Sequence, residues 1–123
     1  MTHPRFNHLS LLLMLAVGAG CGSGSSATTS TLSGADCSQS VPTYSELTIW
    51  PLCTVCHSSS LSGSARQGAP ANVNFDSYAA AARAAGEAVT EVSAGRMPPS
   101  GETQPASAET AALEQWAQCG TPE

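Results

Sequence analysis

The chain has 123 residues, and its four lysine and arginine residues are outnumbered by nine aspartate and glutamate residues, which gives a formal net charge of −5 at pH 7. This length is typical of a single small domain. The acidic balance argues against nucleic-acid binding, because the phosphate backbone requires a basic protein surface, whereas a partner with a basic surface is compatible with it.

Residues 1–20 are predicted to be a secretory signal. Arg5 precedes the apolar run LSLLLMLAVGAG, which is too short to span a bilayer. The small residues before Cys21 resemble the lipobox of bacterial lipoproteins, although Gly18 stands where that motif usually has leucine. The resemblance implies cleavage before Cys21 and lipid attachment to its sulfur, and the alternative is an ordinary signal peptide with a nearby free thiol.

This lipoprotein resemblance also implies a location. The mature chain would be exported and held on the periplasmic side of a bacterial membrane, where disulfides are permitted. Gly22 follows the lipidated cysteine, and in some bacteria a residue other than aspartate at this place directs the protein to the outer membrane.

Residues 21–35 are expected to form a flexible tether, because glycine, serine and threonine dominate them and almost nothing there is large enough to pack. The folded unit is then a single domain over residues 36–123. Bulky aliphatic and aromatic residues are sparse in this domain, and alanine supplies much of its hydrophobicity. Because so small an apolar inventory builds a weak core, we expect something other than the chain to complete it.

The first helix is expected to begin near Thr43 and to end before Pro51. Thr43 followed three residues later by Glu46 matches a capping box. Tyr44 and Trp50 then lie at helical spacing, and Pro51 cannot continue a helix that has already begun.

Two longer helices are expected further along the chain. The alanine-rich segment 76–95 has Asp76 as its predicted N-cap and Gly95 as its stop. The segment 107–120 has Ser107 as its predicted N-cap and Gly120 as its terminator, with Leu113, Trp116 and Ala117 on one face. No segment shows the alternation of a strand, so the sequence predicts an all-α domain.

The stretch CTVCH places Cys53 and Cys56 two residues apart, with His57 directly after them. A thioredoxin-like dithiol would need a βαβ unit, for which no strand pattern exists. A zinc knuckle commonly has a second pair of ligands, and here Cys37 and Cys119 stand alone. The remaining chemistry is covalent attachment of a c-type haem, in which both thiols form thioethers with the haem vinyl groups and the histidine binds iron.

At these residues the chain resembles the small class I cytochromes c over about residues 37–123. The resemblance implies an all-α fold in which short helices wrap around one covalent haem c, which fills the core. Met97, in the segment AGRMPPSG, is the only methionine of the mature chain and is therefore the expected second axial ligand, the alternative being a methionine that fills a gap in the core. Thioether ligation favours ferrous iron and raises the reduction potential.

The resemblance also suggests supporting residues. In the family a proline carbonyl accepts the other N–H of the axial histidine, and Pro70 is the matching position, although an ordinary turn proline is an alternative. Haem propionates need hydrogen-bond donors, and the candidates are Arg66, Arg96, Tyr78 and Trp50, each of which has a plain surface or core role as its alternative.

Cys37 and Cys119 flank the two terminal helices, which the resembled fold brings together. Because Cys21 is assigned to lipid and Cys53 and Cys56 to haem, these two cysteines remain, and we expect a disulfide between them that contributes about 3–4 kcal/mol, with two free or intermolecular thiols as the alternative. Family members often lack such a bridge.

One-electron transfer between donor and acceptor proteins is the function that the resemblance implies, in a membrane-tethered carrier that is not an enzyme. Two alternatives stay open. One is a haem enzyme or a gas or redox sensor with a labile sixth ligand, although no second histidine remains in the mature chain as a distal acid or base. The other is a fixed haem subunit of a larger redox complex.

Overall fold

The computed structural model describes residues 34–123 of the chain. The predicted signal over residues 1–20, the lipid site at Cys21 and most of the predicted tether lie outside the described residues. Within residues 34–123 every regular element is an α-helix or a 3₁₀ turn, and no strand is present. The prediction of an all-α domain is therefore confirmed for this part of the chain.

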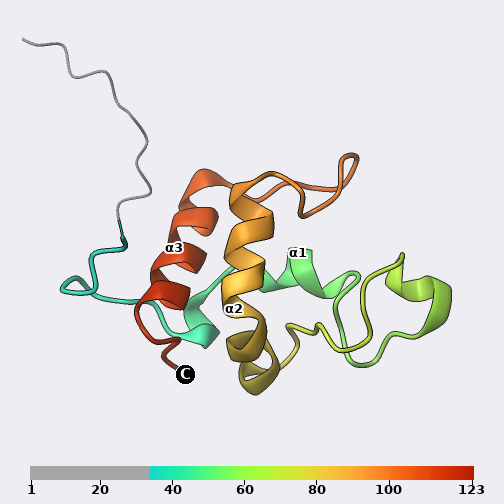
Figure 1. Ribbon diagram of the computed structural model, residues 1–123, viewed down its shortest axis with the longest axis horizontal. Coiled ribbons are helices and arrows are strands. Elements are labelled where there is room, and N and C mark those ends of the chain that lie inside the picture. The colour runs from blue at the N-terminus through green and yellow to red at the C-terminus, as the bar shows by residue number, and fades with distance from the viewer. Residues whose placement is uncertain (1–33) are drawn as a thin grey trace, which may run out of the picture. The chain divides into compact units, whose positions relative to one another are not determined.

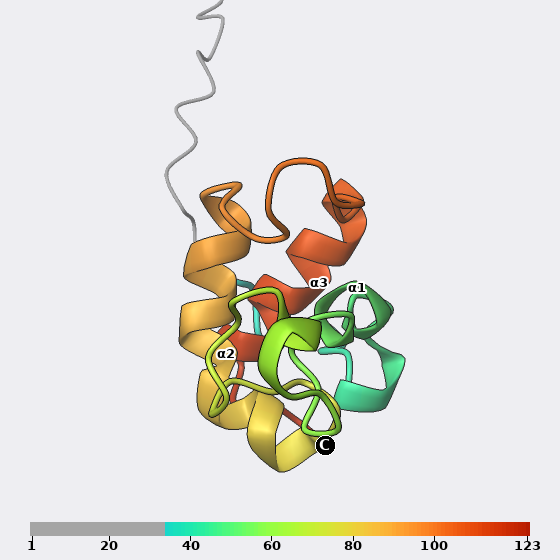
Figure 2. The ribbon, with the colours of Figure 1, turned by 90° about the vertical axis from the view of Figure 1, so that its right-hand side faces the viewer.

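The elements are two 3₁₀ turns and three α-helices. Their order is η1 (Tyr44–Glu46), α1 (Trp50–Thr54), η2 (Gly63–Arg66), α2 (Tyr78–Ser93) and α3 (Ser107–Gln118). α2 and α3 pack against each other in opposite directions, and α1 lies beside them (Figure 1). The segments 55–77 and 94–106 extend from the helices, and Figure 2 shows η2 in front with the segment 94–106 above it.

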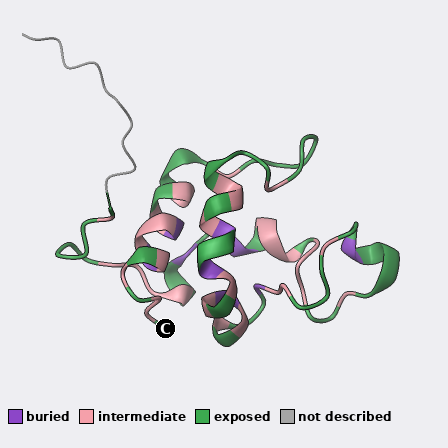
Figure 3. Ribbon diagram, in the orientation of Figure 1, coloured by how far each residue is buried: buried purple, intermediate pink, exposed green. Residues whose placement is uncertain are grey.

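The core lies between α2, α3 and the segment that leads into α1 (Figure 3). α2 contributes a stripe of alanines at helical spacing, Ala81, Ala85 and Ala88, which lets neighbouring side chains approach closely. α3 contributes Leu113 and Trp116, as its apolar face predicts. The remaining buried apolar residues come from other segments and are Leu47, Ile49, Trp50 and Phe75.

Aromatic rings supply most of the bulk in this core. The Trp50 ring stacks on Phe75 with centroids 5.6 Å apart and meets Trp116 edge to face at 5.4 Å. Both indole N–H groups are satisfied, because Trp50 donates to the carbonyl of Tyr44 and Trp116 to that of Pro122, each at 2.8 Å. The cluster thus joins the segment before α1 to the end of α3.

The prediction that Pro51 ends the first helix is wrong. Only a short 3₁₀ turn forms at Tyr44–Glu46, and Pro51 instead lies in the first turn of α1. Proline is tolerated there because the first N–H groups of a helix have no intrahelical partner. The capping interaction itself is present, since the Glu46 carboxylate accepts the Thr43 N–H at 2.8 Å.

Two predicted N-caps are also wrong, although both helices exist. α2 is preceded by Ser77, because the Asp76 carboxylate accepts hydrogen bonds from Ser59 and Ser58 instead. α3 already includes Ser107.

The cap of α3 is one residue earlier, at Ala106. The Glu109 carboxylate accepts the Ala106 N–H at 2.8 Å, so the acid in the first turn satisfies this end of the helix. The predicted ends of both helices are confirmed, with left-handed glycines following at Gly95 and Gly120, where φ is 66° and 92°.

Candidate cofactor site

A cavity of about 410 Å³ opens between α1, the segment 66–75, the second half of α2 and the segment that follows α2. Its lining includes Cys53, Cys56, His57 and Met97, which are the four residues that the sequence selected as haem ligands and attachment points. The volume lies within the range of about 300–1,000 Å³ that small-molecule sites occupy. His57 and Met97, which are 40 positions apart in the chain, therefore line the same cavity.

The CTVCH stretch forms the end of α1 and the turn after it. α1 ends at Thr54, and the N–H groups of Cys56 and His57 both donate to the Cys53 carbonyl, at 3.3 and 2.9 Å. This turn folds the motif back on itself so that Cys53, Cys56 and His57 all line the cavity. Both thiols are free, and Val55 between them is 54% exposed.

His57 is held by a hydrogen bond and by an aromatic contact. Its Nδ1 lies 3.2 Å from the Val73 carbonyl oxygen, and its ring meets Phe75 edge to face with centroids 5.4 Å apart. Because a carbonyl only accepts, Nδ1 carries the proton, and in the neutral imidazole this leaves the lone pair on Nε2. A histidine in this tautomer is ready to bind a metal through Nε2.

The prediction that Pro70 accepts the His57 N–H is wrong. The acceptor is Val73, and the Pro70 carbonyl instead accepts a hydrogen bond from Arg66 at 2.6 Å. Pro70 still lines the cavity. The spacing from the family placed the acceptor three residues too early, because the segment between His57 and Phe75 is folded around the Arg66 side chain.

Three of the four candidate propionate donors are engaged elsewhere. Arg66 is buried, and its guanidinium donates to five oxygens within its own loop. Arg96 pairs with Glu91 at 2.7 Å, and the Trp50 indole N–H is bonded to a backbone carbonyl. The ring of Tyr78 packs edge to face against that of Tyr44. The hydrogen bonds of Arg66, Arg96 and Trp50 explain local folding and do not require a propionate.

Met97 is positioned by the end of α2. The N–H groups of Arg96 and Met97 both donate to the Glu91 carbonyl, at 2.9 and 3.2 Å, while the Arg96 guanidinium binds the Glu91 carboxylate. These contacts fold the chain back after α2, and Met97 and Pro98 both line the cavity. Met97 is partly exposed, and its thioether is a soft, neutral donor.

The electrostatics of Cys53 do not match a reactive dithiol. Burial, reinforced by the nearby Glu109 carboxylate, raises the pKa of the Cys53 thiol to about 11. Redox-active thiols have lowered pKa values because their function depends on the thiolate. Among residues 34–123 no group of three or more His, Cys, Asp and Glu side chains is arranged to hold a metal ion, so the described chain shows no cysteine-rich zinc cluster.

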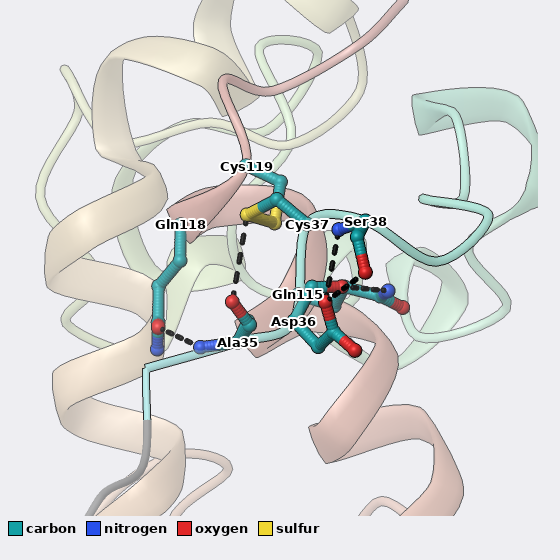
Figure 4. The surroundings of a disulfide bond; sticks show 7 residues. All are labelled: Ala35, Asp36, Cys37, Ser38, Gln115, Gln118 and Cys119. Atoms are coloured by element: carbon teal, nitrogen blue, oxygen red, sulfur yellow. Dashed lines mark hydrogen bonds between the residues drawn. A yellow bond between two sulfur atoms is a disulfide. The ribbon is translucent and has the colours of Figure 1, made fainter.

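Cys37 and Cys119 form a disulfide with their Cα atoms 5.4 Å apart (Figure 4). Two further bonds join the same segments, from the Ala35 N–H to Gln118 Oε1 at 2.7 Å and from Gln115 Nε2 to the Asp36 carbonyl at 3.3 Å. The beginning of the described chain is thereby fastened to the end of α3, on which the core residues Leu113 and Trp116 lie.

The residues that sequence reasoning missed are Val73, Phe75 and the packing role of Arg66. Val73 acts through its backbone, and a backbone carbonyl leaves no signal in a sequence.

No helix in residues 34–123 has both the length and the apolar character to cross a membrane. Comparisons with protein-family models, with curated proteins and with solved structures found no match to this chain.

Proposed function

We propose that the protein is an exported one-electron carrier with one covalent haem c, folded as a class I cytochrome c-like domain. The observation that carries this proposal is the cavity, because both cysteines of CTVCH, its histidine and the only methionine of the mature chain line the same hollow. These four side chains are the attachment and ligand set of a His/Met-ligated c-type haem.

The described residues fit the group in chemistry as well as in position. Cys53 and Cys56 would each add an S–H across a haem vinyl group, which forms a carbon–sulfur bond and transfers the proton to the vinyl carbon. His57 has its Nδ1–H bonded to Val73, which leaves Nε2 as the donor atom for iron. Met97 would supply the second axial ligand.

The bound haem would supply an iron that accepts and releases one electron. The chain's own task is to keep both ligands in place and to limit access of water. Phe75 and the Val73 hydrogen bond restrain the imidazole, and apolar side chains such as Ile49 and Val92 line the cavity. A rigid site of this kind lowers the structural change that accompanies each electron transfer.

The sparse core also supports the proposal. Only nine apolar residues are buried in the described part of the chain, three of them alanines, and a hollow of about 410 Å³ remains between the elements. A haem would complete this core, as the sequence suggested. The small fold would then depend on both the haem and the Cys37–Cys119 disulfide.

The partner would be another redox protein with a basic docking surface. All nine carboxylates lie in residues 34–123, against the three arginines Arg66, Arg83 and Arg96, and one of these three is buried. Complementary charge speeds encounter between proteins without requiring tight binding. Lipid on Cys21 and the residues that follow would keep the domain at the membrane surface while it exchanges electrons.

The test is to express the full chain with a haem-maturation system and to record optical spectra in both redox states. We expect a low-spin c-type haem that is reversibly oxidised and reduced, with no spectral change when carbon monoxide is added to the ferrous protein or peroxide to the ferric protein. A high-spin spectrum with ready ligand binding would favour the haem enzyme or sensor. A purified chain without haem, produced beside a control cytochrome that matures normally, would refute the proposal.

A further inference from the structure

Arg66 is a buried cation whose partners are all neutral. Only 5% of its surface is exposed, yet it lines the cofactor cavity. Its five N–H groups, the full donor set of a guanidinium, each meet an oxygen at 2.6–3.1 Å. The acceptors are four backbone carbonyls and one side-chain amide, those of Ser58, Ala69, Pro70, Val73 and Asn74.

One of these acceptors is shared with the proposed axial ligand. The Val73 carbonyl oxygen accepts from Arg66 Nη2 at 2.9 Å and from His57 Nδ1 at 3.2 Å. A carbonyl oxygen has two lone pairs, so both bonds form, but the cation competes for its electron density. The bond to the imidazole is the longer of the two.

We infer that Arg66 is a positioning residue for His57. Arg66 fixes the Val73 carbonyl and limits how strongly that carbonyl accepts the imidazole proton. Arg66 also adds a positive charge beside the cavity, and none of its five hydrogen-bond partners neutralises this charge. This inference rests on the proposed haem function. It assigns the buried arginine to tuning of the redox equilibrium, apart from its contribution to folding of the loop.

Both consequences act in the same direction. A weaker Nδ1–H···O bond makes the imidazole a poorer electron donor, which disfavours ferric iron. A positive charge in a poorly screened place also disfavours the more positive oxidation state. Arg66 therefore shifts the equilibrium toward ferrous iron, and weakening either effect should return it toward ferric iron.

Asn74 offers a test that leaves Arg66 in place. Its Oδ1 accepts from Arg66 Nη1 at 3.0 Å, and its Nδ2 donates to the Ala71 carbonyl at 3.1 Å. Asn74→Asp in the haem-loaded full chain puts a carboxylate beside the guanidinium. We expect the ferric-to-ferrous ratio at a fixed applied potential to rise on the order of three- to tenfold. Asn74→Ala loses both side-chain bonds without adding charge and should change the ratio by less than about twofold.

Arg66→Lys tests the shared carbonyl separately, because lysine keeps the charge and lacks the planar fork. In the ferrous protein we expect the His57 Nδ1–H proton resonance to move downfield as Val73 becomes a better acceptor. Arg83→Gln removes an exposed arginine on α2 and should change neither readout, because water and salt screen its charge.

The unfolding midpoint of each variant separates a purely structural role from the inferred one. A ratio that rises in Asn74→Asp and stays near wild type in Asn74→Ala supports the inference, whatever happens to stability. Ratios that agree among the wild type and both Asn74 variants, with normal His/Met haem, overturn this inference and leave the proposed function standing. A wild-type protein without haem overturns both.

Discussion

Phe75 holds His57 at two points, since its backbone N–H donates to the His57 carbonyl at 2.9 Å and its ring packs edge to face against the imidazole at 5.4 Å. The same ring stacks on Trp50, so the aromatic core and the candidate ligand are directly connected. The loop 58–74 is closed by this contact, and the orientation of the imidazole depends on the packing of the core.

Phe75→Ala should therefore lower the free energy of unfolding by about 3–5 kcal/mol, because it leaves a cavity between Trp50 and His57. Phe75→Leu should cost less, about 1–2 kcal/mol, since much of the volume is kept and the aromatic contacts are lost. Guanidinium unfolding of the haem-loaded proteins measures both. A cost for the alanine variant below about 0.5 kcal/mol, as at an ordinary surface site, would contradict this role.

Met97→Ala should remove the sixth ligand while leaving the haem covalently attached. We expect loss of the weak far-red sulfur-to-iron band, a shift toward a high-spin ferric spectrum and a lower reduction potential, because a thioether favours ferrous iron. Leu52→Ala is the matched control, since Leu52 lines the same cavity and has no ligand atom. A far-red band that survives in Met97→Ala would assign the sixth ligand to another residue.

Removal of the Cys37–Cys119 disulfide should destabilise the fold strongly. The bridge joins residues 82 positions apart, so the double variant Cys37→Ser/Cys119→Ser should lose about 4 kcal/mol through greater freedom of the unfolded chain. The double variant avoids the intermolecular disulfides that one unpaired thiol would allow. Equal unfolding midpoints for the variant and the oxidised wild type would show that the bridge contributes nothing to stability.

Asp76 should make the fold sensitive to acid. Hydrogen bonds from the Ser59 and Ser58 hydroxyls, joined by the Ser59 N–H, hold the pKa of the Asp76 carboxyl below its usual range. Because the folded-state pKa lies below the unfolded value of about 3.9, the stabilisation is complete above that pH and is lost as the pH falls through the lower, folded-state pKa.

Asp76→Asn should lower stability at neutral pH and flatten the loss of stability between about pH 5 and about pH 2. Ser59→Ala, which removes one hydroxyl donor and keeps the carboxylate, should give an intermediate slope. Unfolding midpoints measured across this pH range check both variants. Parallel curves for Asp76→Asn and the wild type would mean that other carboxyls carry the acid sensitivity.

Much of the fold was predictable because its signals are local. The alanine-rich α2, the apolar face of α3 and the glycines that follow them each depend on a few neighbouring residues, and the structure confirms them. The N-caps were less predictable, because Asp76 had a long-range alternative in Ser59. The position of Pro51 was not predictable, because proline is compatible with both the end and the first turn of a helix.

The site shows the same division. CTVCH and the lone Met97 were visible in the sequence, but only the structure shows that both line one cavity. The hydrogen-bond acceptor for His57 could not be predicted from spacing, because Val73 and Pro70 differ only in how the chain folds around Arg66. A buried arginine with neutral partners has no local sequence signal.

The most direct test of covalent haem attachment is the intact mass of the purified, exported protein under denaturing conditions, after production with a haem-maturation system. Covalent attachment through Cys53 and Cys56 predicts a mass greater than that of the processed polypeptide by one haem. The Cys53→Ala/Cys56→Ala variant should show only the polypeptide. A wild-type mass equal to that of the processed polypeptide alone would contradict covalent haem attachment.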